Sequence, residues 1–472
     1  MNDKFMNGLL TIAGKMQSNA VLSAIKDAFI DNMPVVITGS FAVLFQFIIS
    51  TNAEGYISLA NIPGMQWLTA LTPIWSTANY GCMNFMAVNI CVLVAMHYAE
   101  NLGLRGDKVV PALAIGSFIT LVNTNVTRSL DAATLVSGSN GILQLSSTAE
   151  KGAVVPVTIN SAVASSYTSA TGLFVGLVVG ILATLVYVKL VKSKKLEIKL
   201  PDSVPPNVAA SFSVLFPAVI TLFLVATVGF LVSLSGMSLF DVITALFAPL
   251  QKIVTGLPGF LVIVFLMQLL WWFGIHGPNV MSAVTGPFLG TAFAANNALY
   301  AAKIAPAVGA GGVVAGQNLT YSIISYPFNS VFFGMTGSGI TGGLIIAILL
   351  FSKRDDYKAI AKLAIPCGIF NINEPIIFGI PMVMNPLMAI PFFLAPIASV
   401  SLGYFLTQIG FCPVFALDAP WTTPIGILGF LDAGGNIMGA VSQLLCFALT
   451  IVIYAPFVIA SNKVPSEAPA EA

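Results

Sequence analysis

Apolar runs long enough to cross a membrane recur along this sequence. Residues 172–191, 211–235, 386–409 and 437–459 each contain at most one charged side chain. A helix needs about 20 predominantly apolar residues to cross the hydrocarbon core of a bilayer, so these runs predict several membrane-spanning helices. The composition agrees, since 57% of the residues are hydrophobic and only 8% are charged, against about a quarter charged in soluble domains. We therefore predict an all-α polytopic membrane protein and exclude an ordinary cytosolic protein.

A lysine-rich segment lies near the middle of the chain. Residues 189–199 contain five lysines against a single acid, Glu197. Short lysine-rich loops stay on the cytoplasmic side of a membrane, so we expect this segment there. Residues 200–210 contain three prolines, which prevent a continuous helix. We therefore predict an N-terminal half (1–199), a cytoplasmic linker (200–210), a C-terminal half (211–461) and a disordered tail (462–472) without an apolar face.

The clean apolar runs amount to about nine spans, of which residues 34–50 form the first and residues 331–351 another. Residues 1–28 and 240–254 interleave polar and apolar side chains, a pattern typical of helices on a membrane surface. The N-terminal residues lack the regions of a cleaved signal peptide, so we expect none. Five cysteines are scattered, mostly through apolar runs, and this spacing predicts neither a metal site nor a disulfide framework.

One acid lies inside a long apolar tract of the C-terminal half. Glu374 follows Asn371 and Asn373, and a Pro, a Gly and a second Pro come after it. A charged side chain is costly at membrane depth and usually has a function there. Helix-breaking residues at that depth are tolerated only where the backbone is buried in protein or lines a wet cavity. The sequence therefore predicts a polar ligand site around Glu374.

A second broken apolar segment contains His276, which has glycines on both sides and is followed closely by Asn279. Paired, interrupted apolar segments are the best sequence indicator of a transporter's binding site. Carboxylate, imidazole and amide groups together suit an uncharged ligand with many hydroxyls, and Trp421 offers a face for stacking on a sugar. Alternatively, Glu374 and His276 only satisfy backbone groups that the kinks leave free. The candidate ligand-binding residues are His276, Asn279, Asn371, Asn373, Glu374 and Trp421.

Other polar features give weaker signals. Asp418 and Asp432 border broken segments, where each fits either the site or a loop, and we favour the loop for both. The pair Gln317 and Asn318 fits either part of a re-entrant hairpin or a plain loop. Glycine-rich residues 309–316 are not followed by the Gly-Lys-Ser/Thr of a phosphate-binding loop, so an ATP-driven pump is not predicted. No basic stripe indicates nucleic acid, and we expect no metal and no bound cofactor.

With these features together, the chain resembles the enzyme IIC subunit of the bacterial phosphoenolpyruvate-dependent phosphotransferase system (PTS), in its lactose/cellobiose/diacetylchitobiose branch. Three motifs carry the resemblance: LPDSVPPNV (residues 200–208), WFGIHG (272–277) and NINEPIIFG (371–379). The resemblance covers essentially the whole chain in order, and the third motif is fairly specific.

The resemblance implies a homodimer in the bacterial cytoplasmic membrane, with about ten spans per chain. The N-terminal half would form the dimer scaffold, and the C-terminal half would hold two re-entrant hairpins and the sugar site. It also implies that His276 and Glu374 contact the sugar hydroxyl that becomes phosphorylated. The phosphate would come from phosphorylated IIB, and we expect IIB and IIA to be separate chains because no stretch here is long enough for either.

The mechanism expected from these features is translocation of a β-linked disaccharide, coupled to its phosphorylation. Glu374 would orient the sugar hydroxyl and act as its general base, while His276 would hold the same hydroxyl or bind the phosphoryl group. The chain itself would carry no phosphorylated residue. An ion-coupled secondary sugar transporter, with Glu374 carrying a proton, is the alternative. A channel or purely structural membrane protein would make both residues incidental.

Overall fold

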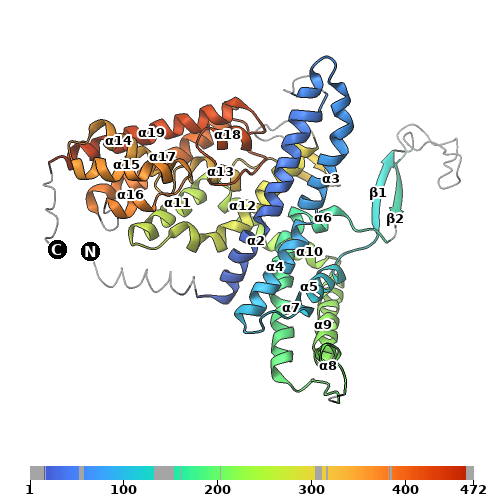
Figure 1. The fold of residues 1–472 in the computed structure, drawn as a ribbon. Coiled ribbons are helices and arrows are strands. Elements are labelled where there is room, and N and C mark those ends of the chain that lie inside the picture. Colours follow the sequence, from blue (N-terminus) through green and yellow to red (C-terminus); the bar gives the residue numbers. More distant parts are fainter. Residues whose placement is uncertain are drawn as a thin grey trace.

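The chain folds mainly into helices, as the computed structural model shows (Figure 1). The structure describes residues 15, 18–52, 58–131, 154–159, 161–201, 203–302, 311–314, 317–380, 382 and 385–463. The earlier helices are α2 (Ala20–Phe45), α3 (Thr72–Met83), α4 (Met86–Asn101), α5 (Val109–Thr120), α6 (Ser165–Thr168), α7 (Leu173–Ser193), α8 (Pro206–Ser213), α9 (Leu215–Ser233) and α10 (Leu239–Val254). The later helices are α11 (Leu257–Trp272), α12 (Gly277–Ala301), α13 (Tyr326–Phe332), α14 (Thr341–Phe351), α15 (Asp355–Ile369), α16 (Glu374–Gly379), α17 (Pro386–Gln408), α18 (Ile427–Asp432) and α19 (Ile437–Ser461).

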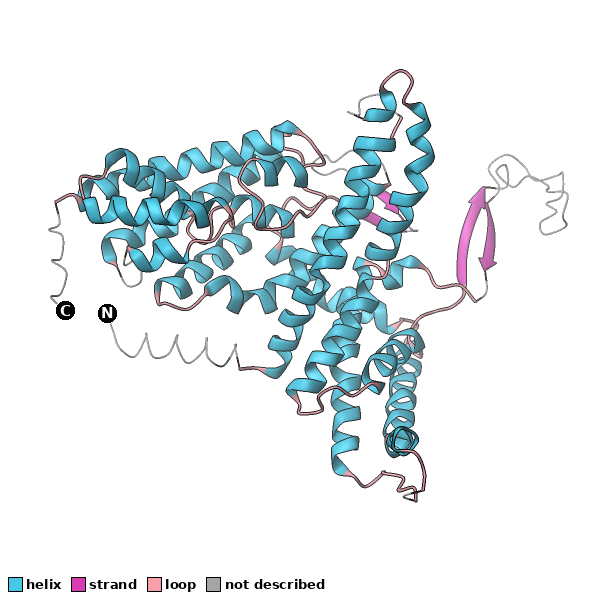
Figure 2. Cartoon of the chain, in the orientation of Figure 1, coloured by secondary structure: helices cyan, strands magenta, loops and turns pink. Residues whose placement is uncertain are grey.

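Short elements complete the described part. A π-helical turn, η1 (Gln46–Ser50), extends α2, and single 3-10 turns cover Leu59–Asn61, Gln66–Leu71 and Ala170–Gly172. The strands β1 (Val126–Asp131) and β2 (Val154–Ile159) pair antiparallel, with Val126 opposite Ile159. So do β3 (Gly311–Val314) and β4 (Gln317–Thr320), with Gly311 opposite Thr320. The pair β1–β2 extends away from the helices (Figure 2). The expected all-helical fold therefore carries two small strand pairs, and one contains Gln317 and Asn318.

The helices form two groups, with α2 and α12 between them (Figure 1). The N-terminal group is α4, α5, α7, α9 and α10, in which α4 packs against α7 and α9 packs against both α5 and α7. The C-terminal group is α11 and α13–α19, in which α19 packs against α14 and α17. The helices α9 and α10 thus lie with the first group, although both follow the proline-rich linker in the sequence.

Five described helices are long and apolar enough to cross a membrane, and the number rises to seven if each of two bent helix pairs is one span. The bends measure 42° between Gln66–Met83 and Met86–Asn101, and 73° between α10 and α11. The expected spans at 172–191, 211–235, 386–409 and 437–459 correspond to α7, α9, α17 and α19. The chain is therefore a multi-pass membrane protein.

Two expected elements differ from the structure. The expected first span began at residue 34, but α2 already begins at Ala20, where the Asn19 side chain accepts hydrogen bonds from the Val21 and Leu22 N–H groups at 3.0 Å. Residues 20–28 therefore belong to a spanning helix rather than to a surface helix, and residues 1–14 lie outside the described part. The expected span 331–351 is wrong, because the chain breaks between α13 and α14.

The amphipathic segment expected at 240–254 is confirmed as the helix α10. A capping box begins it: Ser238 Oγ accepts from the Asp241 N–H at 3.1 Å, and Asp241 Oδ2 accepts from the Ser238 N–H at 3.0 Å. Two backbone N–H groups that the helix leaves unpaired are satisfied in this way. Phe240 and Ile243 are buried, while the apolar side chains of Leu246, Leu250 and Ile253 are exposed.

One end of several helices lies on the lysine-rich side of the molecule. The Asn101 amide at the end of α4 donates to the Ala20 carbonyl at the start of α2, at 3.0 Å. Lys192 at the end of α7 donates to the Leu102 carbonyl just after α4. These contacts place the start of α2 and the ends of α4 and α7 together. Because short lysine-rich loops stay in the cytoplasm, this is the expected cytoplasmic side.

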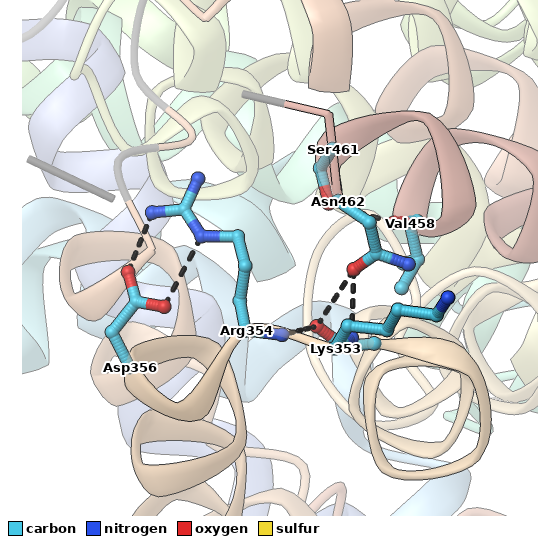
Figure 3. A network of polar contacts seen from close by, with 7 residues as sticks. Lys353, Arg354, Asp356, Val458, Ser461 and Asn462 are labelled. Carbon is cyan, nitrogen blue, oxygen red and sulfur yellow. Dashed lines mark hydrogen bonds and ion pairs between the residues drawn. The ribbon is translucent and has the colours of Figure 1, made fainter. Parts of the chain in front are cut away.

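A second basic segment connects the ends of α14 and α19 (Figure 3). The Asn462 side chain accepts from the Lys353 N–H at 2.7 Å and donates to the Phe351 carbonyl at 3.0 Å. Beside it, Arg354 donates two hydrogen bonds to the Asp356 carboxylate, at 3.1 and 2.5 Å. The hydrogen bonds from Arg354 lower the pKa of this exposed carboxyl. Asn462 therefore caps the end of α14 and fixes it to the end of α19.

A buried amide pair connects the two sides of the molecule. Asn79 of α3 donates to the Asn297 Oδ1 of α12 at 3.2 Å and to the Gly39 carbonyl of α2 at 3.0 Å. Asn297 in turn donates to the Ala416 carbonyl at 3.1 Å, in the loop that follows α17. Both asparagines are buried. This chain of amides joins α2 and α3 to the C-terminal group.

Small residues bring α4 and α7 into close contact. Gly176 and Gly180 are four residues apart in α7 and therefore share one face of the helix. A Cβ at Gly176 would lie 2.5 Å from the Ala87 carbonyl oxygen, and one at Gly180 would lie 2.7 Å from that of Cys91. Small residues at this spacing let two membrane helices approach closely.

We expect Gly180→Ala to lower the free energy of unfolding by roughly 1–3 kcal/mol, because the added methyl group overpacks the contact with α4. The measurement is thermal unfolding of the detergent-purified protein. Gly81→Ala in α3 is the matched control, because its Cβ would meet nothing within 4 Å. Equal melting midpoints for the two variants would contradict this packing.

Candidate functional site

A cavity of about 890 Å³ lies between α2 and the C-terminal group. This volume is typical of sites for small molecules. Its lining includes all six of the residues singled out by sequence: His276, Asn279, Asn371, Asn373, Glu374 and Trp421. Across from them, α2 contributes Lys26, Phe29, Ile30, Met33 and Val36. The structure therefore brings the two broken segments together and closes them against a largely apolar helix.

Glu374 is the first residue of the short helix α16, which follows the N-cap residue Asn373. The N-terminal end of a helix favours a negative charge, so the carboxylate has a favourable position there. Its side chain is partly buried at the cavity wall, and it makes no ion pair within the described residues. A ligand in the cavity can therefore reach its oxygens.

His276 is the N-cap residue of α12. Its Nδ1 accepts a hydrogen bond from the Asn279 N–H at 3.2 Å, so a neutral ring carries its hydrogen on Nε2. The ring packs against Trp271, with 4.7 Å between the ring centroids. It is also near enough to Glu374 for the two groups to interact electrostatically. His276 can therefore donate a hydrogen bond to the oxygen of a ligand that Glu374 also contacts.

Asn371 connects three separate segments through its side-chain amide. Its Oδ1 accepts from the Thr336 N–H at 2.6 Å, and its Nδ2 donates to the carbonyls of Trp421 at 2.5 Å and Thr423 at 2.9 Å. The Asn373 amide donates to the Ser338 carbonyl at 2.6 Å. Both asparagines are buried. Their contact with a ligand stays a prediction, and the structure adds a role in fixing the backbone.

The backbone beside these amides adopts an unusual conformation. Thr336, Ile340 and Asn371 have φ values of 56°, 51° and 65°, and Gly337 and Gly339 between the first two also have positive φ. Positive φ is uncommon outside glycine, and clusters of such residues are typical of functional sites. A Cβ at Gly337 would lie 2.3 Å from the Asn373 Cγ, so only glycine fits against this asparagine.

Sequence reasoning missed several residues of the cavity. Gly334, Gly337 and Ser338 line it. They lie in the break that was expected to be part of a span, although its glycines, including Gly339, could have indicated that break. Lys26 lines it from α2, where it forms an ion pair with Asp27 at 3.2 Å. Asp418, which we had interpreted as a loop residue, also lines it. No local pattern distinguishes Asp418 from an acid on a solvated loop.

The five cysteines are free, and no group of three or more His, Cys, Asp or Glu side chains within the described ranges could hold a metal ion. Trp421, with 47% of its surface exposed, presents its indole to the cavity. The site consists of a carboxylate, an imidazole, amides and an aromatic face. Such a set binds hydroxyl groups on one side and the apolar face of a ring on the other.

We expect Asn371→Ala to destabilise the protein even without a ligand, because it leaves the Thr336 N–H and two carbonyls without their partner. Removing such a partner costs about 1–3 kcal/mol, which thermal unfolding of the purified protein would measure. Asn279→Ala is the control, because the Asn279 side chain is exposed at the same cavity. If both variants unfold at the wild-type temperature, Asn371 does not brace these segments.

Comparisons with known proteins identify the family of this chain. A family model described as "Phosphotransferase system, EIIC" matches residues 26–396. The oligo-beta-mannoside-specific EIIC component of Bacillus subtilis (strain 168) is 32% identical over 98% of this chain and 94% of its own length. The cellobiose-specific EIIC component of Lactococcus lactis subsp. lactis is 30% identical over 96% of each chain. The crystal structure of ChbC, the IIC component of the N,N'-diacetylchitobiose-specific phosphotransferase system, has a TM-score of 0.79 at 28% identity and covers 96% of each chain.

Proposed function

The chain belongs to the EIIC family of the phosphotransferase system, and on this premise we propose that it carries a β-linked disaccharide across the bacterial cytoplasmic membrane. Transport is coupled to phosphorylation of the sugar by phosphorylated IIB, a separate chain that receives its phosphate from IIA. The observation that most supports the proposed transport of a disaccharide is the cavity, because Glu374, His276 and Trp421 all line it. The relatives' names supply the substrate class of cellobiose, oligo-beta-mannoside and diacetylchitobiose.

The cavity has the chemistry that an uncharged disaccharide needs. Sugar hydroxyls donate to the Glu374 carboxylate and accept from the His276 ring. The C–H faces of the two sugar rings pack against Trp421 and, on the other side, against Phe29 and Met33 of α2. A lipid-facing helix would not carry such polar groups, because each would lack a partner.

Phosphorylation requires that the sugar hydroxyl lose its proton as the phosphoryl group arrives. The sulfur–phosphorus bond on the IIB cysteine breaks, and a bond forms between phosphorus and the sugar oxygen. Glu374 accepts the hydroxyl proton as general base, while His276 holds the same oxygen or the transferring group. Among the described residues, Lys26 is the only lysine or arginine that lines the cavity. Its positive charge favours the anionic product.

The proposed architecture follows the family. Each chain has about ten spans and two re-entrant hairpins, and two chains form a dimer through the N-terminal half, residues 1–199. The part that binds the sugar and moves it across the membrane lies within the C-terminal half, 211–461. Because α9 and α10 pack with the N-terminal group, we place the start of the moving part at α11 rather than at the linker.

The binding test uses purified protein with cellobiose, diacetylchitobiose and lactose in turn. We expect at least one of them to bind and Glu374→Gln to weaken binding by about tenfold or more, since a hydrogen bond to a charged group contributes roughly 1.5–3 kcal/mol. Glu100→Gln, an exposed acid near the end of α4, is the matched control. Wild-type affinity in Glu374→Gln would remove this residue from the site.

The coupling test uses inverted membrane vesicles with phosphoenolpyruvate and the soluble components of the system. We expect sugar phosphate to form only when phosphorylated IIB is present, and Glu374→Gln to form it at less than about a tenth of the wild-type rate. Glu100→Gln again serves as control. Ion-driven uptake of unmodified sugar without phosphoenolpyruvate would contradict the proposed coupling.

A further inference from the structure

Two buried aspartates lie beside the cavity, and the proposed mechanism uses neither. Asp418 has 4% of its surface exposed and Asp432 has none. Asp418 lines the main cavity and also a small pocket against α2, where Ser40, Phe41 and Leu44 face it. Asp432 ends the short helix α18, directly behind the same loop.

Main-chain hydrogen bonds hold the two aspartates close together. The Ala419 N–H donates to Asp432 Oδ1 at 2.7 Å, and the Ala416 and Leu417 N–H groups donate to the Asp432 carbonyl at 3.2 and 3.3 Å. Residues on both sides of Asp418 are therefore bonded to Asp432. The other carboxylate oxygen, Asp432 Oδ2, is buried and has no hydrogen-bond partner in the described part of the chain.

No described cation forms an ion pair with either aspartate. Lys26 lines the same cavity as Asp418, but its ammonium group pairs with Asp27 at 3.2 Å. Tyr326 of α13 lies near Asp418, and Tyr300 of α12 packs beside Ala416 and Leu417. A tyrosine side chain is either neutral or negative, so neither of them supplies a positive charge to the aspartates. The ion pairs of the described residues join Lys26 to Asp27, His97 to Asp31 and Arg354 to Asp356, so none of them involves Asp418 or Asp432. The Gln443 side chain of α19 has other partners. Its oxygen accepts from the Gly426 and Gly429 N–H groups, and its nitrogen donates to the Val331 carbonyl.

Two carboxylates this deeply buried and without an ion-pair partner resist being ionised together, because burial and mutual repulsion both disfavour the second charge. We propose that Asp418 and Asp432 hold one proton between them, and that this proton keeps the loop at 416–423 in its sugar-binding conformation. The unpartnered Asp432 Oδ2 is the place for that proton, shared with the Asp418 carboxylate. The control of sugar binding by this proton rests on the proposed function, whereas the presence of the shared proton does not.

The loop connects the proton to the sugar site. It continues from Ala419 to Trp421, whose indole lines the cavity and whose carbonyl accepts from the Asn371 amide. Loss of the proton leaves both carboxylates negative, and their mutual repulsion opposes the close approach of the loop at Asp418 to Asp432. Sugar affinity should therefore be full at lower pH and decline as the pH rises.

The binding test measures the dissociation constant of the disaccharide that binds best, from about pH 6 to about pH 9. For one proton, the constant rises by at most about tenfold per pH unit. We expect this rise in the wild type and a flat profile in Asp432→Asn, which keeps an oxygen to accept from Ala419 but removes the second charge. Both histidines remain in that variant, so their titration cancels in the comparison. Asp355→Asn, an exposed acid in the first turn of α15, should retain the wild-type profile.

A second measurement does not need a sugar. The melting midpoint of the purified, sugar-free protein should fall as the pH rises from about 4, where an aspartate of the unfolded chain loses its proton, to the pH at which sugar affinity declines, and both Asp432→Asn and Asp418→Asn should flatten that fall. Two asparagine variants are used so that, if one of them folds poorly, the other still tests the proton pair. A fall in both variants that equals the wild-type fall, or no fall in the wild type, would overturn the proton pair. A flattened melting profile without binding of any sugar would instead retain the pair and reject the proposed function.

Discussion

The amide of Asn371 is the contact on which the site depends. It reaches the α13–α14 loop through Thr336 and the loop after α17 through the carbonyls of Trp421 and Thr423. Each of these segments is irregular, and irregular backbone inside a membrane protein survives only where its polar groups find partners. One buried side chain supplies three of those partners. Glu374 can therefore face the cavity without having to satisfy the backbone of these segments itself.

The sequence indicated the six residues that line one cavity, whereas it located the ends and breaks of several helices less well. Glu374 and His276 stood out because charge, glycine and proline are rare in apolar tracts, and a rare residue is visible without any knowledge of the fold. The break between α13 and α14 was missed because apolar neighbours such as Phe332 and Ile345 keep the average hydropathy high across it. The early start of α2 was missed because Lys26 and Asp27 resemble a surface pattern, whereas in the structure they pair with each other at the cavity.

Asp418 and the packing of α9 and α10 could not be predicted for a different reason. Both depend on contacts between residues far apart in the chain: Asp418 on the loop that folds over Asp432, and α9 on its approach to α5 and α7. Periodicity reports only which face of an element is apolar. It does not say which partner covers that face, and so a boundary drawn at a proline-rich linker need not be the boundary between packed groups.

The amide pair of Asn79 and Asn297 restricts how the protein can change shape. Both side chains are buried, and their bond joins α3 to α12, while Asn297 also holds the Ala416 carbonyl. Sliding α12 along α3 would break the bond between the two buried amides, although Asn79 would keep the Gly39 carbonyl and Asn297 the Ala416 carbonyl. A buried polar group that loses its partner costs about 1–3 kcal/mol. Rotation about an axis through this point would leave the bond intact. From this structure, rotation of α12 relative to α3 about the two asparagines therefore costs less free energy than translation of α12 along α3.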